Sequence, residues 1–185
     1  MNLSTLPIYC LLTLFIVCGQ SSSYAAENNA SSIDCNKANT AAAKSAPINW
    51  HVKVHNTYPH RSNAFTQGLI YHQEKLFEST GHYGQSSISQ IHINTGEVIQ
   101  HRALDKTVFG EGITIWNNEL IQLTWKSGQV YRYSLSDFSL QKTQNIQGEG
   151  WGMTHNGQSL ITSNGSAQLS FRDPQSLAKQ STLNV

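Results

Sequence analysis

A short pattern recurs three times in the chain at nearly constant spacing. A glycine followed by an apolar, β-prone run occurs at Gly68, Gly112 and Gly152, so the intervals between copies are 44 and 40 residues. We call these three positions the register glycines. Repeats of about forty residues are typical of blade and solenoid architectures, in which one supersecondary unit is used several times.

Each repeat contains further runs with the pattern of β-strands. In the first repeat a second run covers Lys75–Thr80, a third alternates apolar and polar residues over Ile88–Ile93, and a fourth covers Val98–Arg102. Period-two alternation indicates a half-buried strand. Four strands in about forty residues make one blade of a β-propeller, so we predict an all-β chain with about three blades. The predicted blades span about residues 63–104, 107–146 and 147–185.

An alternating run, Trp50–Tyr58, precedes the first repeat and is predicted to be a strand that ends at Pro59. In a propeller, a leading strand commonly joins the last blade and closes the ring. Three blades are too few to close a ring, so we expect either a fragment or a chain that assembles with another. Its free blade edges favour aggregation or dimer formation.

The amino terminus has the pattern of an export signal. Leu6–Cys18 is apolar but too short to span a bilayer, and small residues follow it. We therefore predict a signal peptide over residues 1–26, cleaved after Ala25 or Ala26, and a secreted or periplasmic protein without stable membrane association. No Lys or Arg precedes the apolar run, which leaves an uncleaved anchor as the alternative.

Residues 27–49 are rich in Ala, Ser and Asn and show no periodicity, so they are predicted to form a disordered linker before a propeller domain over 50–185. Cys35 lies in this linker and would be the only cysteine of the mature chain, which excludes an internal disulfide. The chain has a formal net charge of +1 and only 12% charged residues. Nucleic acids and anionic membrane surfaces are therefore not expected as partners.

The residues just before the register glycines are Gln67, Glu111 and Trp151. The first strand of each blade lines the axis of a propeller, so these side chains are expected to meet at one mouth of the channel. Trp125 ends the second strand of its repeat, and a hairpin would return it to Glu111. A carboxyl group walled by Trp125, Trp151 and Phe65 would have a raised pKa, which suits a general acid/base.

Other candidate sites are weaker. The chain has no Gly-x-Ser-x-Gly elbow, His-Glu-x-x-His motif, phosphate-binding loop or dinucleotide fingerprint. His51 and His55 share one face of the leading strand but lack a third ligand nearby, so no metal or cofactor site is predicted. The glycine-rich stretch Gly81–Ser87 is predicted to be a turn between strands. Glu149, between two glycines, is expected to be an ordinary turn residue.

Several motifs resemble, in the same order, those of the glutamine cyclotransferase family, the plant and bacterial type of glutaminyl-peptide cyclotransferase. The matching stretches are Tyr58–His60, Ala64–Leu69, Glu78–Ser87, Phe109–Thr114, Gln122–Lys126 and Glu149–Thr154. The resemblance implies a five-bladed β-propeller that converts the N-terminal glutamine of peptides or proteins to pyroglutamate, with release of ammonia and without a metal. It implies that Glu111 is the catalytic carboxylate and that Phe65, Gln67, Trp125 and Trp151 line the substrate pocket.

The resemblance also implies two further blades that would contribute an asparagine, a tryptophan and a lysine to the pocket. These have no counterpart before Val185, so an inactive truncated enzyme is one alternative. A second is a non-catalytic secreted propeller that binds peptide or glycan ends through an aromatic mouth. A metal-dependent, lactonase-like propeller ranks last, because Glu111 is the only carboxylate among the three residues that precede the register glycines.

Overall fold

The computed structural model describes residues 50–185, and this part of the chain contains strands and turns but no helix. The signal peptide predicted for 1–26 and the linker predicted for 27–49 lie outside the described residues. Residues from Val52 onward form one compact unit. Residues 50–185 contain no helix with the length and apolarity that are needed to span a membrane.

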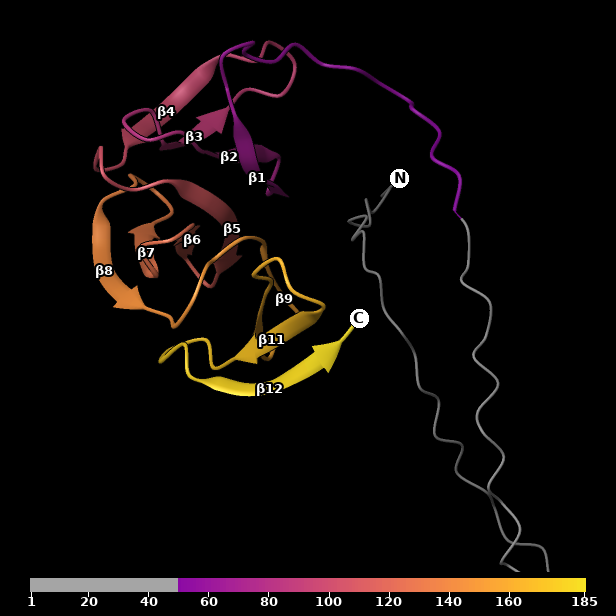
Figure 1. The fold of residues 1–185 in the computed structure, drawn as a ribbon. Helices are drawn as coiled ribbons and strands as arrows, with labels where there is room; N and C mark the ends of the chain where they lie inside the picture. Colours follow the sequence, from indigo (N-terminus) through magenta and orange to yellow (C-terminus); the bar gives the residue numbers. More distant parts are fainter. Residues whose placement is uncertain (1–49) are drawn as a thin grey trace, which may run out of the picture. The chain divides into compact units, whose positions relative to one another are not determined.

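Twelve strands of the described chain form three antiparallel sheets of four strands each, and every sheet follows chain order (Figure 1). The first sheet contains β1 (Thr66–His72), β2 (Lys75–Thr80), β3 (Ser87–Ile91) and β4 (Val98–Ala103). The second contains β5 (Gly110–Trp116), β6 (Glu119–Thr124), β7 (Gln129–Ser134) and β8 (Leu140–Asn145). The third contains β9 (Met153–His155), β10 (Leu160–Thr162), β11 (Gln168–Arg172) and β12 (Lys179–Asn184). The three predicted blades are confirmed, one for each repeat.

The strand predicted for Trp50–Tyr58 is wrong. Residues 50–60 adopt no strand, and their side chains are exposed, with Trp50 at 85% of its full accessibility. A strand is held by backbone hydrogen bonds to a neighbour, and no strand of the three described sheets pairs with this segment. Alternation of apolar and polar residues is therefore not enough to make a strand here.

The register glycines allow the first strands of successive blades to approach each other closely. β5 contacts both β1 and β9, and the Gly112 amide donates a hydrogen bond to the Trp151 carbonyl at 2.7 Å. A Cβ on Gly112 would lie 2.5 Å from that carbonyl oxygen, and a Cβ on Gly68 would lie 2.8 Å from the amide nitrogen of Ile113. The repeat of glycines therefore reflects a packing requirement between blades.

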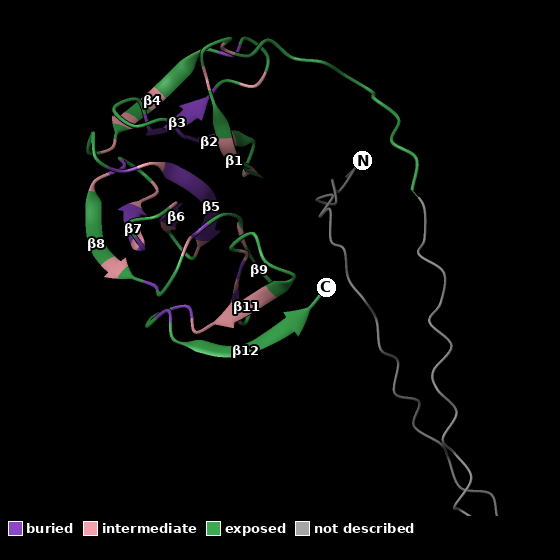
Figure 2. Cartoon of the chain, viewed as in Figure 1, coloured by how far each residue is buried: buried purple, intermediate pink, exposed green. Residues whose placement is uncertain are grey.

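The middle blade is buried on both faces, whereas the outer strands β4, β8 and β12 are largely exposed (Figure 2). Leu120 of β6 belongs to a core cluster with Phe77 and Ile88 of the first blade. Its neighbour Ile121 belongs to a second cluster with Leu160 of the third blade. Successive residues of a strand face opposite sides, so β6 supplies both cores.

The buried carboxylate of Glu78 ties the segment before β1 to the first blade. It accepts hydrogen bonds from Thr66 Oγ1 at 2.5 Å, His60 Nε2 at 2.7 Å and Arg61 Nη2 at 2.8 Å. Burial by itself would raise the pKa of Glu78, but the hydrogen bonds from Thr66, Arg61 and His60 outweigh it and hold the pKa below its ordinary value.

We predict that Glu78→Gln lowers the free energy of unfolding by about 2 kcal/mol at pH 7, because the Arg61 guanidinium loses its buried partner. In the wild type, this contribution is present above the unfolded-state pKa and is lost as pH falls through the lowered folded-state pKa. Urea denaturation between pH 3 and 7 measures both effects. Glu97→Gln, at an exposed carboxylate, is the control and should change little. Equal stability of Glu78→Gln and the wild type at pH 7 contradicts this role.

Candidate active site

Glu111 and Gln67 are in direct contact between the first and second blades. Each is the second residue of its blade's first strand, and Gln67 Nε2 donates a hydrogen bond to Glu111 Oε1 at 3.1 Å. Both lie where the strand register shifts, between Thr66 and Gly68 in β1 and between Gly110 and Ile113 in β5. Such bulges redirect side chains out of the regular alternation. The structure thus brings together two of the predicted site residues.

The environment of Glu111 favours its neutral form. The residue is 8% exposed, and burial raises its pKa to about 7, with a smaller upward contribution from the negative charge of Glu149. The hydrogen bond from Gln67 acts in the opposite direction, because it stabilises the carboxylate. The shift has the direction expected from the sequence. Near neutral pH this group can therefore both accept and donate a proton.

The indoles of Trp125 and Trp151 share one carboxylate oxygen. Trp125 Nε1 donates to Glu149 Oε2 at 2.8 Å, and Trp151 Nε1 donates to the same atom at 2.9 Å. The hydrogen bond from Trp151 and the smaller effect of the one from Trp125 hold the pKa of Glu149 below its ordinary value, and the positive charge of Lys126 acts in the same direction. Glu149 is therefore ionised at neutral pH and fixes the two rings relative to each other.

The expectation that Glu149 is an ordinary turn residue missed this role. Glu149 lies three residues before its register glycine, as do Phe65 and Phe109 in the other two repeats. Aligning the repeats at this position, rather than only at the residue before the glycine, would have marked Glu149 as part of the site.

Phe109, which is not among the predicted site residues, lies at the centre of an aromatic cluster. The second hairpin returns Trp125 to the start of β5, where its ring centroid lies 5.6 Å from that of Phe109. The Phe65 ring packs edge-on against Phe109 at 6.2 Å. Phe65 and Trp151 are about half exposed, at 47% and 45%. The Lys126 ammonium lies 4.1 Å from the centroid of the Trp125 ring, which is therefore partly covered. Phe65 and Trp125 thus both pack against Phe109 near the start of β5, and Trp151 joins them through the carboxylate it shares with Trp125.

Between residues 50 and 185, no three His, Cys, Asp or Glu side chains are grouped so that they could hold a metal ion. His51 and His55, the pair considered from the sequence, are both exposed.

Comparisons with known proteins agree with the fold. The Glutamine cyclotransferase family model matches residues 27–185. The glutaminyl-peptide cyclotransferase of Arabidopsis thaliana is 38% identical over 128 residues, which cover 68% of this chain and 40% of the plant protein. The Myxococcus xanthus glutaminyl cyclase structure aligns with a TM-score of 0.65 and 35% identity, over 69% of this chain and 54% of that chain.

A more distant match shows the fold alone. The WD40 domain of Neurospora crassa Pan2 is 7% identical and aligns with a TM-score of 0.54, over 64% of this chain and 36% of that chain. Fold and site together define a β-propeller with a buried carboxyl group of raised pKa between its first two blades. Because the family model covers most of the sequence, the chain belongs to the glutamine cyclotransferase family. It spans 40% of the Arabidopsis protein and 54% of the Myxococcus chain.

Proposed function

We propose that this chain acts as a glutaminyl-peptide cyclotransferase, which converts the N-terminal glutamine of peptides and proteins to pyroglutamate and releases ammonia. The observation that carries the proposal is Glu111, a buried carboxyl group with a pKa of about 7 that is hydrogen-bonded to Gln67, in a chain of this family. A group with this pKa is suited to both proton transfers that the reaction needs.

The reaction joins the α-amino nitrogen of the substrate to the carbonyl carbon of its own side-chain amide. The Glu111 carboxylate accepts a proton from the attacking amine as the new C–N bond forms. The resulting carboxylic acid then gives this proton to the amide nitrogen as the old C–N bond breaks and ammonia leaves. Glu111 ends in its starting form, and no net proton is exchanged with the enzyme.

The neighbours of Glu111 have separate tasks in this scheme. Gln67 is within hydrogen-bond reach of Glu111, and its amide N–H can stabilise negative charge on the substrate's amide oxygen. Trp125 and Trp151 provide apolar walls for the aliphatic part of the glutamine, which favour the folded reactive conformation and exclude water. Glu149 keeps the two indoles in place through its shared oxygen.

The test is ammonia release from a glutamine-leading tripeptide, compared with the same tripeptide acetylated at its α-amine. Cyclisation needs the free amine, so ammonia is expected from the first peptide alone. Release from both peptides contradicts the proposal, because it indicates hydrolysis of the side-chain amide. Binding of the free peptide without ammonia release favours the alternative of a non-catalytic propeller.

We also propose that the protein works outside the cytoplasm, in the periplasm or the medium. The support is the apolar run Leu6–Cys18 and the small residues after it. Mass spectrometry of the protein isolated from its native host should give a mature chain that begins at Ala26 or Glu27. Recovery of the chain with Met1 from the cytoplasm contradicts this location.

We predict that Glu149→Gln moves the acid limb of the pH profile of kcat/KM to lower pH. Activity rises as Glu111 becomes a carboxylate, and removing the nearby negative charge lets it ionise at lower pH. The glutamine carbonyl can still accept hydrogen bonds from the indoles, so the rings keep an acceptor. The part of the pH profile that reports ionisation of the substrate's α-amine depends on the peptide alone and should not shift. Glu97→Gln is the control, and an identical shift in it, or none in Glu149→Gln, contradicts the prediction.

A further inference from the structure

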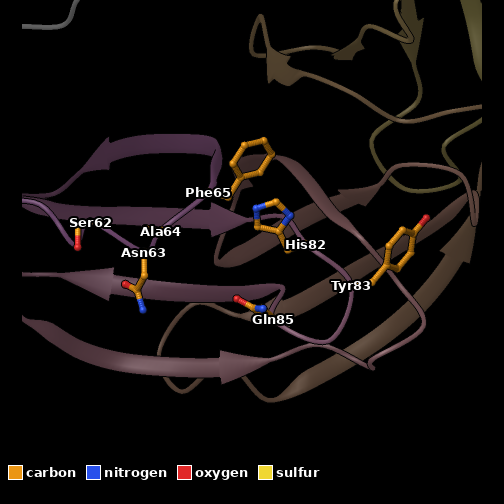
Figure 3. A pocket seen from close by; sticks show the side chains of 7 residues that line it. All are labelled: Ser62, Asn63, Ala64, Phe65, His82, Tyr83 and Gln85. Carbon is orange, nitrogen blue, oxygen red and sulfur yellow. The ribbon is translucent and has the colours of Figure 1, made fainter.

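One hollow in the described part of the chain is lined by Phe65, two residues before Gln67 of the proposed site, and does not include Glu111 in its lining. A cavity of about 490 Å³ opens between the segment before β1 and the loop that joins β2 to β3 (Figure 3). Its walls include Ser62, Asn63, Phe65, His82, Tyr83 and Gln85. A smaller hollow of about 200 Å³ shares most of these residues and extends to Arg61 and His101. The volume of the larger cavity is within the range of ligand sites.

The loop that forms one wall is fixed to the strand that carries Glu111. The Gly81 amide donates to the Phe65 carbonyl at 2.8 Å. The Ser86 hydroxyl donates to the His82 carbonyl at 2.8 Å and accepts a hydrogen bond from the Gly110 amide at 3.0 Å. Gly110 is the residue immediately before Glu111. The cavity therefore keeps a defined position next to the proposed reaction site.

Aromatic rings connect the cavity to the proposed site. The Phe65 ring lies over His82 with a centroid distance of 4.2 Å and an interplanar angle of 30°, and Figure 3 shows the two rings side by side. The Tyr83 ring packs against Phe109 at 5.6 Å. Phe65 and Phe109 stand two residues before Gln67 and Glu111, the hydrogen-bonded pair. Tyr83 is 53% exposed, so much of its surface is free to contact a ligand.

The backbone of this loop is strained at His82. His82 has a φ of 76°, in the left-handed region that residues other than glycine rarely adopt. Such backbone strain is concentrated at binding sites, where it presents a side chain in a required position. The exposed amides of Asn63 and Gln85 add donors and acceptors that match the backbone of an extended peptide.

We infer that this cavity binds the second and third residues of the peptide substrate, with an aromatic or apolar side chain at the second position between Phe65 and Tyr83. The inference rests on the proposed function. The reacting amine and side-chain amide must both reach Glu111. The rest of the peptide is joined to the glutamine through its α-carbonyl, so it extends away from Glu111 on that side. The aromatic walls then contact the second side chain, and the amides of Asn63 and Gln85 bind the main chain.

The test compares kcat/KM for the tripeptides Gln-Phe-Gly and Gln-Gly-Gly. The wild type should prefer the phenylalanine peptide by about tenfold through a lower KM, which is the effect expected of aromatic contacts. Tyr83→Ala should reduce the preference to about twofold or less, and Tyr83→Phe should retain it. Tyr71→Ala, at a tyrosine that is 62% exposed on β1, is the matched control and should keep the full preference.

Failure of this inference is distinct from failure of the proposed function. If both peptides release ammonia but Tyr83→Ala keeps the wild-type preference, the cavity is not the subsite. If neither peptide releases ammonia, the proposed function is wrong. Calorimetry with pyroglutamyl-Phe-Gly and pyroglutamyl-Gly-Gly then tests peptide binding by the cavity independently of catalysis. Tighter binding of the first that is lost in Tyr83→Ala supports the cavity, and equal binding of the two overturns it.

Discussion

Replacing Glu111 by glutamine is expected to lower kcat for pyroglutamate formation by about a thousandfold. The amide has nearly the same shape as the carboxyl group but cannot accept and return a proton near neutral pH. The fold should tolerate the change, because burial already favours the neutral form of Glu111. The raised pKa means that the folded wild type binds a proton more tightly than the unfolded chain, so wild-type stability falls as pH rises from the unfolded-state pKa to about 7.

Two measurements on Glu111→Gln separate loss of chemistry from loss of fold. Ammonia release at saturating peptide measures kcat, and urea denaturation at pH 5 and pH 8 measures stability. The variant should lack the fall in stability between these two pH values that the wild type shows. A variant that retains more than about a tenth of the wild-type kcat contradicts the acid/base role, since that role accounts for a hundredfold or more.

Gly112→Ala is expected to lower the free energy of unfolding by about 3 kcal/mol, because the added methyl group overpacks the contact between the second and third blades. Its Cβ would lie 2.5 Å from the Trp151 carbonyl oxygen and 2.7 Å from the Met153 amide nitrogen. These are backbone atoms, so relief requires the inner strands to separate. The change also breaks the hydrogen bond from the Gly112 amide to Trp151 and displaces Glu111.

The matched control for this glycine is Gly157→Asn. Gly157 has a φ of 86°, and a Cβ there would meet nothing within 4 Å. Asparagine tolerates the left-handed region better than most residues, so the control should cost less than about 1 kcal/mol. Thermal or urea denaturation compares the two variants. A Gly112→Ala protein as stable as the control contradicts the close approach of β5 and β9.

The strands of the repeats could be predicted because their signals are local. The run Lys75–Thr80 became β2 with the same bounds, and the alternating run Ile88–Ile93 became β3, whose first residue is one position earlier and whose last residue is two positions earlier. The leading run Trp50–Tyr58 has the same alternation but no neighbouring strand among the described sheets. Strand formation depends on such a partner, and the pattern within one segment does not contain it.

The candidate site shows the same limit at the level of single residues. Glu111 and Glu149 both lie between two glycines, as Gly-Glu-Gly, yet their environments are opposite. Glu111 is buried and has a raised pKa, whereas Glu149 accepts hydrogen bonds from two indoles and has a lowered pKa. The difference comes from residues of other strands. Spacing relative to the register glycine distinguishes the two, but their local sequence does not.

The lining of the cavity was also beyond local sequence analysis. The glycine-rich stretch forms the connection between β2 and β3 over residues 81–86, as predicted, but its function as a wall depends on where His82 and Tyr83 point. That direction is set by ring contacts with Phe65 and Phe109, which belong to the segments before β1 and β5. A glycine-rich turn gives no local indication of such contacts.

The most direct test of the central claim is the mass of the product formed from a glutamine-leading tripeptide in water enriched with heavy oxygen. Intramolecular cyclisation at Glu111 predicts a pyroglutamyl peptide that has lost ammonia and carries no heavy oxygen, with one ammonia released for each product. A glutamate-leading peptide that contains heavy oxygen, or recovery of the unchanged tripeptide, would contradict the assignment of this chain as a glutaminyl-peptide cyclotransferase.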